Sequence, residues 1–414
     1  MKVAYFDYWT KGYINFKTFD EALKAQGAET VLLHIGSFRY EHPKEEVIDG
    51  ITCRDISYYN TKYVYEMLKQ EKPDLVVSLN TTYLFDRALV LACRKLGIES
   101  VFMMHGIRSF GKEGTAAYLN EVKKAYNPLL RKLAKGKKYI GTVIPNYIYS
   151  LRKYDSAKYW NLHFAKVIYS YFKDPGKAFR FPAYADEVLH DRCLIYCKNE
   201  IEYYTTLGYQ KEQIEIVGSP KFDSLLQELK DGSFGKENLP EEVKPFVEGD
   251  KPYALILDDP YPEQNQYGGV TNEDRIEYYH KMIDKFKAMG YPTIIKLHPA
   301  TIEENVKIDR EGVLITKKAL DHLINNAAFC VSQFSTTINN CVLMGKPIIK
   351  PHWGKYNNII KFYCEIGVSN LWEDFDQEID LSMNEKARTE FLDTFITVLE
   401  PVAKDNIVKS ILRN

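Results

Sequence analysis

No run of 18 apolar residues occurs in the 414-residue chain, so a membrane-spanning helix is not expected. The amino-terminal stretch MKVAYFDYWTKGY also lacks the continuous apolar segment of a signal peptide. The formal net charge is only −1, which argues against a protein that binds polyanions with its whole surface. The seven cysteines have no partners at zinc-site spacing, and several fall in apolar stretches. These absences favour a reducing cytoplasm and make a metal site at the cysteines unlikely.

Short apolar strands alternate with amphipathic helices along most of the sequence. This pattern predicts an α/β fold of parallel sheets with helices on both faces. A chain of 414 residues is too long for one ordinary core, so two Rossmann-like domains are expected. The predicted parts are a first domain at 1–235 that contains a helical insertion at 121–180, a linker at 236–250, a second domain at 251–383, and a terminal helical region at 384–414 that can pack back on the first domain.

The insertion at 121–180 breaks the alternation. It carries fourteen Lys or Arg against three Asp or Glu, and aromatic residues are interleaved with them. One interpretation is a solvated basic helical face. The other is a surface that docks on anionic lipid headgroups, with the aromatic side chains at the membrane interface. Nucleic acid is not an expected partner, because no recognisable binding module surrounds the insertion.

The stretch from Thr293 to Pro351 contains the most informative motifs. His298-Pro299 follows an apolar strand that contains Lys296, and Ser335-Thr336-Thr337 follows another. Ligands of open parallel sheets bind outside the carboxyl ends of the strands, so both clusters are placed to bind one. An imidazole donates to phosphate, and hydroxyls at a helix start hold anions. The alternative is that the histidine is structural and the hydroxyls are ordinary helix N-caps.

The order of these motifs, followed by a helix and Gly345-Lys346-Pro347, resembles the carboxyl-terminal domain of GT-B glycosyltransferases. The nearest groups are bacterial CDP-glycerol glycerophosphotransferases, capsule-type Kdo transferases, and sialyl- and polysialyltransferases. The resemblance implies two domains that face a central cleft, with His298 on the donor phosphate and Ser335 and Thr336 on phosphate or ribose. Asn340 stands where related enzymes carry a ribose-binding carboxylate. The remaining residues expected at the nucleotide site are Lys296, Pro299, Thr337, Gly218, Ser219 and Asp258.

Two features of the first domain fit the same resemblance. His105-Gly106 after a strand resembles an element of the glycerophosphotransferases whose histidine faces the reacting centre. Gly218-Ser219-Pro220, with Asp223 after it, resembles a turn shared with UDP-N-acetylglucosamine 2-epimerases. Transfer to a hydroxyl requires a base from this domain, for which His105 is the first candidate and Asp7, after the first strand, the second.

Asp258-Asp259 superficially suggests an acidic metal site. The resemblance implies metal-independent chemistry, so a cleft-rim or capping role is preferred for this pair, and no cofactor is expected.

The predicted activity is transfer of a sugar or polyol phosphate from a CMP- or CDP-linked donor to a bacterial surface glycan or lipid-linked acceptor. The expected location is the cytoplasm or the inner face of the membrane. One alternative is a UDP-N-acetylglucosamine 2-epimerase, against which Asn340 and the basic insertion argue. The other is a non-catalytic, membrane-docked scaffold that has lost turnover.

Overall fold

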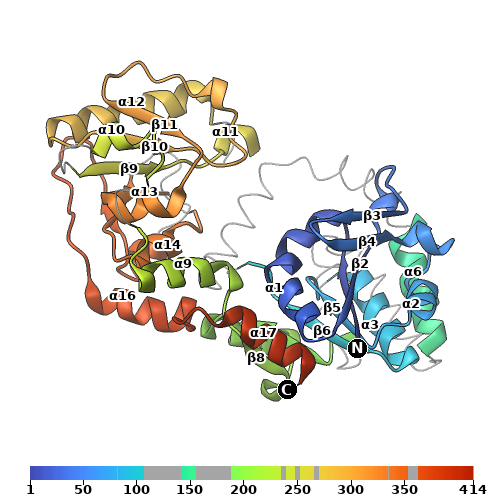
Figure 1. Cartoon of the computed structure of the whole chain (residues 1–414). Helices are drawn as coiled ribbons and strands as arrows, with labels where there is room; N and C mark the ends of the chain where they lie inside the picture. The colour runs from blue at the N-terminus through green and yellow to red at the C-terminus, as the bar shows by residue number, and fades with distance from the viewer. Residues whose placement is uncertain are drawn as a thin grey trace. The chain divides into compact units, whose positions relative to one another are not determined.

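The computed structural model describes residues 1–81, 83–106, 141–154, 188–234, 239–247, 252–264, 270–333, 335–352 and 362–413 (Figure 1). Contacts divide the chain into two compact units. Of the described residues, the first unit holds those up to Asp223 and those from Glu400 onward, and the second holds Ser224–Leu399. Each unit has its own sheet and its own core.

The sheet of the first unit has the strand order β3-β4-β2-β1-β5-β6-β7-β8. Its pairs are parallel except for the antiparallel β3–β4 edge hairpin, which the sequence did not predict. Strands β2 to β4 lie on one side of β1, and strands β5 to β8 lie on its other side, as in a Rossmann fold. The strands are β1 (Lys2–Asp7), β2 (Glu29–His34), β3 (Glu45–Ile48), β4 (Ile51–Asp55), β5 (Leu75–Ser78), β6 (Glu99–Met103), β7 (Arg192–Ile195) and β8 (Ile214–Ile216).

Helices cover both faces of this sheet, which is why its strands read as continuous apolar runs. In β1, Val3 and Tyr5 enter one core, whereas Ala4 and Phe6 enter the other. α1 and α17 lie on the first face, and α2, α3 and α6 on the second (Figure 1). The described α-helices of this unit are α1 (Tyr13–Ala25), α2 (Val64–Glu71), α3 (Leu84–Leu96), α6 (Val143–Tyr154), α8 (Ile201–Leu207) and α17 (Ala403–Leu412), and α9 (Pro220–Asp231) runs across the division between the units.

The described part of the basic insertion, residues 141–154, belongs to the core of the first unit. Tyr147 is fully buried, and Asn146 accepts a hydrogen bond from the Val64 amide at 2.8 Å. Tyr149 stacks on Tyr63 with ring centroids 4.0 Å apart. Tyr147 is therefore a packing residue of the core, whereas Tyr149 is partly exposed. The rest of the insertion lies outside the described residues.

The second unit contains a parallel sheet with the strand order β11-β10-β9-β12-β13-β14. α12 buries Tyr278, Met282 and Phe286, which recur at helical spacing, against this sheet. The strands are β9 (Tyr253–Leu257), β10 (Thr293–Lys296), β11 (Val313–Thr316), β12 (Ala327–Val331), β13 (Ile348–Pro351) and β14 (Asn370–Trp372). The described helices that lie wholly in this unit are α10 (Lys244–Val247), α11 (Tyr261–Gln264), α12 (Asn272–Ala288), α13 (Leu320–Asn326), α14 (Ile338–Leu343), α15 (Phe362–Glu365) and α16 (Glu385–Phe391).

The boundary between the units differs from the predicted linker. Contacts divide the chain within α9, between Asp223 and Ser224, and the predicted linker at 236–250 includes α10. The terminal helical region is also divided. A π-helical turn at Leu392–Ile396 follows α16, and α17 begins at Ala403, two residues after Pro401. Only α17 joins the first unit, where Ile407 and Ile411 enter the core beside α1.

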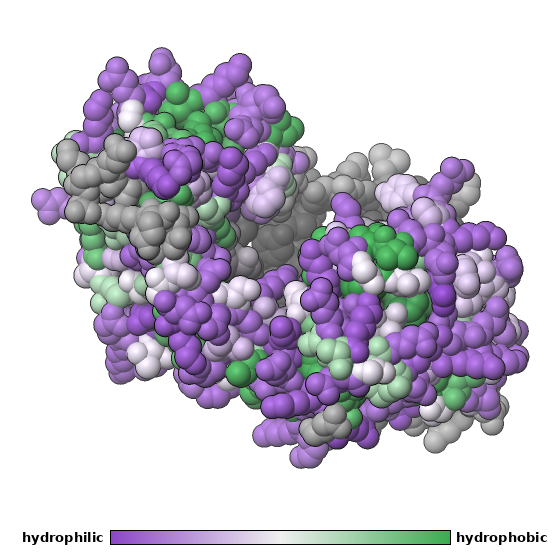
Figure 2. Space-filling model, viewed as in Figure 1, coloured by the Kyte–Doolittle hydropathy of each residue, from purple (hydrophilic) through white to green (hydrophobic). Residues whose placement is uncertain are grey.

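On the face seen in Figure 2, hydrophilic side chains dominate the described surface of each unit. Among the described residues, no helix combines the length and the apolarity required to cross a membrane.

Candidate active site

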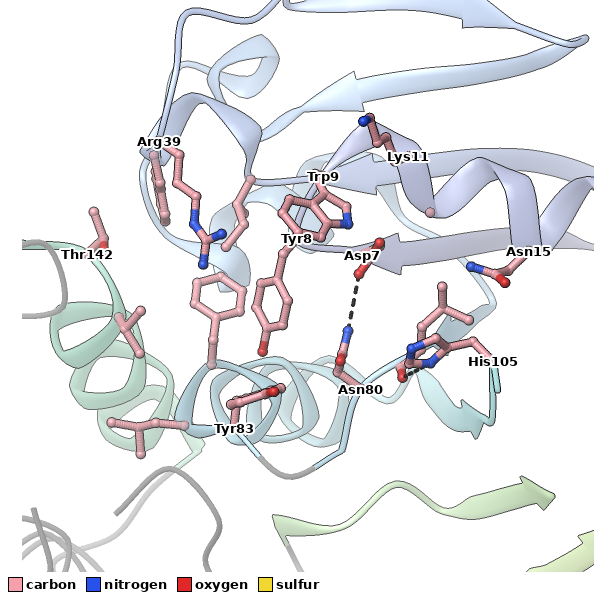
Figure 3. A pocket seen from close by; sticks show the side chains of 17 residues that line it. Asp7, Tyr8, Trp9, Lys11, Asn15, Arg39, Asn80, Tyr83, His105 and Thr142 are labelled. Atoms are coloured by element: carbon pink, nitrogen blue, oxygen red, sulfur yellow. Dashed lines mark hydrogen bonds between the residues drawn. The ribbon is translucent and has the colours of Figure 1, made fainter. Parts of the chain in front are cut away.

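The carboxyl ends of β1, β5 and β6 border a pocket of about 510 Å³ in the first unit (Figure 3). Both candidate bases, Asp7 and His105, line it, although 98 positions separate them in the sequence. The other lining residues are Tyr8, Trp9, Lys11, Gly12, Asn15, Ile35, Phe38, Arg39, Leu79, Asn80, Tyr83, Leu84, Phe85, Thr142 and Val143. The pocket lies beside the topological switch point of the sheet, where Rossmann-like folds bind their ligands.

Asp7 is almost fully buried, with 6% of its surface exposed. Its Oδ1 accepts a hydrogen bond from Asn80 Nδ2 at 3.1 Å (Figure 3). The carboxylate also packs against the backbone of Gly12, where a Cβ atom would lie 2.5 Å from Oδ2. Burial raises the pKa of Asp7 to about 6, because the charged form loses its hydration. This carboxyl group can therefore exchange a proton near neutral pH.

His105 has a defined orientation at the other side of the pocket. Its Nδ1 lies 3.1 Å from the carbonyl oxygen of Leu79. A carbonyl only accepts, so Nδ1 carries the proton and Nε2 is the acceptor of the neutral ring. His105 has an exposed surface, but desolvation by its surroundings still lowers its pKa. The neutral imidazole thus offers an acceptor atom at physiological pH.

Aromatic and cationic side chains form the wall opposite these groups. Arg39 lies over the ring of Trp9, 5.6 Å from its centroid. Tyr8 contacts Tyr83 edge-on and donates from its hydroxyl to the buried Asp86 at 2.5 Å. Flat apolar faces combined with charged and amide groups suit a polar substrate that also has an apolar face.

In the second unit, Asp258 follows β9 and organises the loop that contains His298. One carboxylate oxygen accepts from the His298 amide at 3.1 Å and from the Thr301 hydroxyl at 2.5 Å. The other accepts from the hydroxyl of Tyr279, and Arg275 Nη1 lies 3.7 Å from it. The predicted capping role thus describes Asp258 better than direct contact with a nucleotide.

The ring of His298 is also fixed by its own loop. Nδ1 accepts the amide proton of Ala300 at 3.0 Å, so the ring proton of the neutral form is on Nε2. Desolvation lowers the pKa of His298, which favours this neutral form. Pro299 is exposed and restricts the loop between these residues. His298 can therefore donate one hydrogen bond through Nε2 without carrying a charge.

The hydroxyl cluster precedes α14 as predicted. Thr337 donates from its hydroxyl to Ser335 Oγ at 2.8 Å, and Thr336 is exposed. The amides of residues 338, 339 and 340 donate to the carbonyls of residues 335, 336 and 337 at 3.0 to 3.1 Å. Those three amides thus already have partners within the turn that starts the helix. The hydroxyls of the cluster are the groups that the sequence predicts to hold an anion.

Two other predicted nucleotide residues have partners within the unit. Lys296 is buried, and its Nζ donates to the Leu297 carbonyl at 3.0 Å. Asn340 donates from Nδ2 to Asp321 Oδ1 at 2.7 Å. Asp321, which lies on α13, was not predicted from the sequence. The residues around it give no sign that its carboxylate accepts a hydrogen bond from Asn340.

A buried polar cluster at the ends of β9, β12 and β13 was missed as well. Lys350 donates to Gln333 Oε1 at 3.1 Å, and Gln333 donates to the hydroxyl of Tyr278 and to the Pro351 carbonyl. Asp259 lies beside this cluster with 6% of its surface exposed. Burial and the neighbouring Asp258 raise its pKa to about 8.

The turn at 218–223 lies in the first unit and has a structural function. Gly218 has a φ of +84°, which favours glycine, and Ser219 is buried. Asp223 accepts hydrogen bonds from the amides of Ala403 at 3.1 Å and Lys404 at 2.7 Å, at the start of α17. The aspartate of this motif therefore attaches the terminal helix to the first unit.

Comparisons with known proteins agree with this architecture. No family model and no curated protein sequence matches the chain. Among solved structures, the UDP-GlcNAc 2-epimerase of Methanocaldococcus jannaschii aligns with a TM-score of 0.50 at 13% identity, covering 100% of each chain. Staphylococcus aureus MnaA in complex with UDP aligns with a TM-score of 0.50 at 13% identity, covering 100% of this chain and 97% of that one. A putative UDP-N-acetylglucosamine 2-epimerase of Listeria monocytogenes aligns with a TM-score of 0.54 at 12% identity, covering 99% of this chain and 95% of that one. The chain has the GT-B type of fold, two Rossmann-like units in succession.

Proposed function

We propose that the protein transfers a sugar or polyol phosphate from a nucleotide-activated donor to an acceptor hydroxyl, with a cytidine nucleotide as the first candidate donor. The observation that carries this proposal is the pocket of the first unit, where Asp7 and His105 are both held by hydrogen bonds. Activation of a hydroxyl requires a base whose pKa is near the working pH, and burial brings Asp7 into that range.

In the proposed reaction, the acceptor hydroxyl loses its proton to Asp7 and attacks the activated carbon or phosphorus of the donor. The bond to the nucleotide phosphate breaks, and the nucleotide leaves with the electron pair. We assign the proton to Asp7 because its carboxyl is the more buried group and has the raised pKa. His105 accepts a hydrogen bond at Nε2 from the acceptor. This order reverses the one that the sequence suggested for the two residues.

The donor is assigned to the carboxyl edge of the second sheet. His298 offers a neutral Nε2–H, and Ser335 and Thr336 offer hydroxyls, which suit the oxygens of a phosphate that gains charge as it leaves. Asp258 positions the His298 loop by accepting a hydrogen bond from the His298 amide. The preference for cytidine rests on the histidine-proline and hydroxyl motifs. The UDP named with the similar MnaA structure supports a pyrimidine nucleotide more generally.

Epimerisation of UDP-N-acetylglucosamine is the second candidate, because the fold is shared with an epimerase. The sequence argued against it through Asn340, which replaces an expected carboxylate. Asp321, with a carboxylate oxygen 2.7 Å from the Asn340 amide, weakens that argument because it supplies an anion at the same place. Ligand binding can distinguish the two candidates.

The experiment is thermal shift and calorimetric titration of the full chain with CMP, CDP, UDP and GDP. Transfer from a cytidine donor predicts stabilisation by CMP or CDP. Stabilisation by UDP alone, with conversion of UDP-N-acetylglucosamine to its C2 epimer by NMR, would support the epimerase. A chain that binds no nucleotide would fit the non-catalytic scaffold and refute both enzymatic candidates.

A His298→Ala variant examines the donor assignment. We expect its nucleotide affinity to fall about tenfold, because one hydrogen bond to phosphate is lost. His322→Ala is the matched control, since His322 lies on α13 and its ring packs edge-on against Phe234. Equal losses in the two variants would remove His298 from the proposed site.

A further inference from the structure

A second group of polar side chains lies at the edge of the first sheet, where the sequence analysis identified nothing. His34 ends β2, His42 is in the following loop, and Glu46 lies on β3. One ligand atom from each of the three lies within 4.8 Å of the others. Two imidazoles and a carboxylate are a donor set that zinc and similar divalent ions prefer.

The strand register explains why these residues converge. Cys53 of β4 is opposite Glu46 of β3, and Asp55 of the same strand is opposite His34 of β2. Side chains two apart on a strand share a face of the sheet, so Glu46, Asp55 and His34 lie on one face. The loop between β2 and β3 then returns His42 to the same place, and its ring lies 5.2 Å from that of His34.

Both imidazoles are placed in an unusual way for structural histidines. His34 is fully buried, and its Nε2 has no hydrogen-bond partner among the described residues. Nδ1 of His42 is likewise buried without a partner in the described part of the chain. Buried polar atoms normally have a partner, and a coordinated ion is one way to provide it.

An outer carboxylate is also present. The Gly36 amide donates a hydrogen bond to Nδ1 of His34 at 3.2 Å, and Asp55 Oδ2 lies 3.3 Å from the same nitrogen. Metal-binding histidines commonly donate their second ring N–H to a carboxylate. Coordination through Nε2 would therefore move the ring proton to Nδ1, where Asp55 accepts it in place of the contact with the Gly36 amide. Gly36 leaves room for both rings, because a Cβ atom there would lie 2.5 Å from Cδ2 of His42.

We propose that His34, His42 and Glu46 bind one divalent transition-metal ion, zinc in the first instance. Ligands at about 2.0–2.2 Å from a tetrahedral ion lie roughly 3.3 Å from one another, so binding requires only small side-chain movements. Two residues of the same loop, Phe38 and Arg39, line the pocket of the first unit. The ion therefore fixes the pocket wall and takes no part in the transfer itself. It is independent of the proposed function.

The test uses the full chain without an affinity tag. The protein is incubated with Zn²⁺, dialysed against metal-free buffer and analysed by inductively coupled plasma mass spectrometry. We expect about one zinc ion per wild-type chain and at least a tenfold loss of affinity in His42→Ala and in Glu46→Gln, because each removes one ligand. Glu45→Gln is the control. Glu45 precedes Glu46 on β3, has its side chain on the other face, and pairs with Arg54.

A second measurement separates loss of the site from loss of the fold. Zn²⁺ should raise the melting temperature of the wild type and of Glu45→Gln, and leave that of Glu46→Gln unchanged. Cobalt(II) should give the visible absorption of a tetrahedral site in the first two proteins only. A wild-type chain that retains no metal, or a Glu46→Gln chain that binds as well as Glu45→Gln, would overturn the proposal.

Discussion

The carboxyl edges of the two sheets use aspartates in different ways. In the first unit, Asp7 borders a pocket, and among the described residues one side chain, Asn80, donates a hydrogen bond to it. In the second unit, Asp258 accepts from two side-chain hydroxyls and one amide and lies near Arg275. Asp7 can therefore exchange a proton, whereas Asp258 holds the loop that contains His298. Both side chains are buried, so the difference lies in their hydrogen-bond partners and in the pocket beside Asp7 rather than in exposure.

The largest expected effect is on turnover and comes from Asp7 at the carboxyl edge of the first sheet. Asp7→Asn should reduce turnover by about 10²–10⁴-fold, the range for loss of a general base, while nucleotide affinity stays unchanged. The wild-type rate should rise as pH increases through about 6, because the Asp7 carboxyl then loses its proton. The variant should lack this inflection. Steady-state kinetics between pH 5 and 8 provide the measurement, with the exposed Asp49→Asn as control. Activity of Asp7→Asn within threefold of the wild type would show that Asp7 is not the general base.

The next effect is on stability and comes from Asp258 at the carboxyl edge of the second sheet. Asp258→Ala leaves Arg275 and the His298 loop without their carboxylate, and we expect a loss of about 3 kcal/mol of unfolding free energy. Asp284→Ala, in the same unit, removes an exposed pair with Arg310 and should cost less than about 1 kcal/mol. Urea unfolding measures both. If the two losses are similar, Asp258 does not hold the loop as described.

The third effect concerns Asp259, whose raised pKa lowers the free energy of unfolding at high pH. The folded-state pKa is about 8 against an ordinary value of 3.8, so ionisation favours the unfolded chain as pH rises between these values. Asp259→Asn should match the wild type near pH 4 and exceed it by several kcal/mol above pH 8, because each pKa unit of difference corresponds to about 1.4 kcal/mol. Guanidinium unfolding at pH 5, 7 and 9 follows the difference. A difference that is constant with pH would show that Asp259 is charged in the folded state throughout.

Much of the fold followed from local patterns. The alternation of short apolar strands with amphipathic helices predicted two parallel sheets, because apolar runs bounded by polar residues are a local property. The hairpin strands at 45–48 and 51–55 were missed, since half or fewer of their side chains are apolar and a hairpin at a sheet edge needs no long apolar run.

Individual site residues were harder to interpret. Asp7, His105 and His298 were identified because each stands at or just beyond the carboxyl end of a strand, and a parallel sheet brings such residues to one edge. The function of Asp258 in holding a loop depends on Tyr279 and Thr301, which are 21 and 43 positions away. The position of Tyr147 in the core depends on α6 packing against α2 and α3.

The sequence by itself therefore determined that two parallel sheets form, and which polar residues stand at their carboxyl edges. Tertiary structure decided how those residues are used: an aspartate beside a pocket, an aspartate beneath a loop, and an amide paired with the carboxylate of Asp321. The physical reason is the range of the interactions. Strand and helix formation depend on neighbours a few positions away, whereas the charge and hydrogen bonding of a side chain depend on partners that only strand register and helix packing bring near.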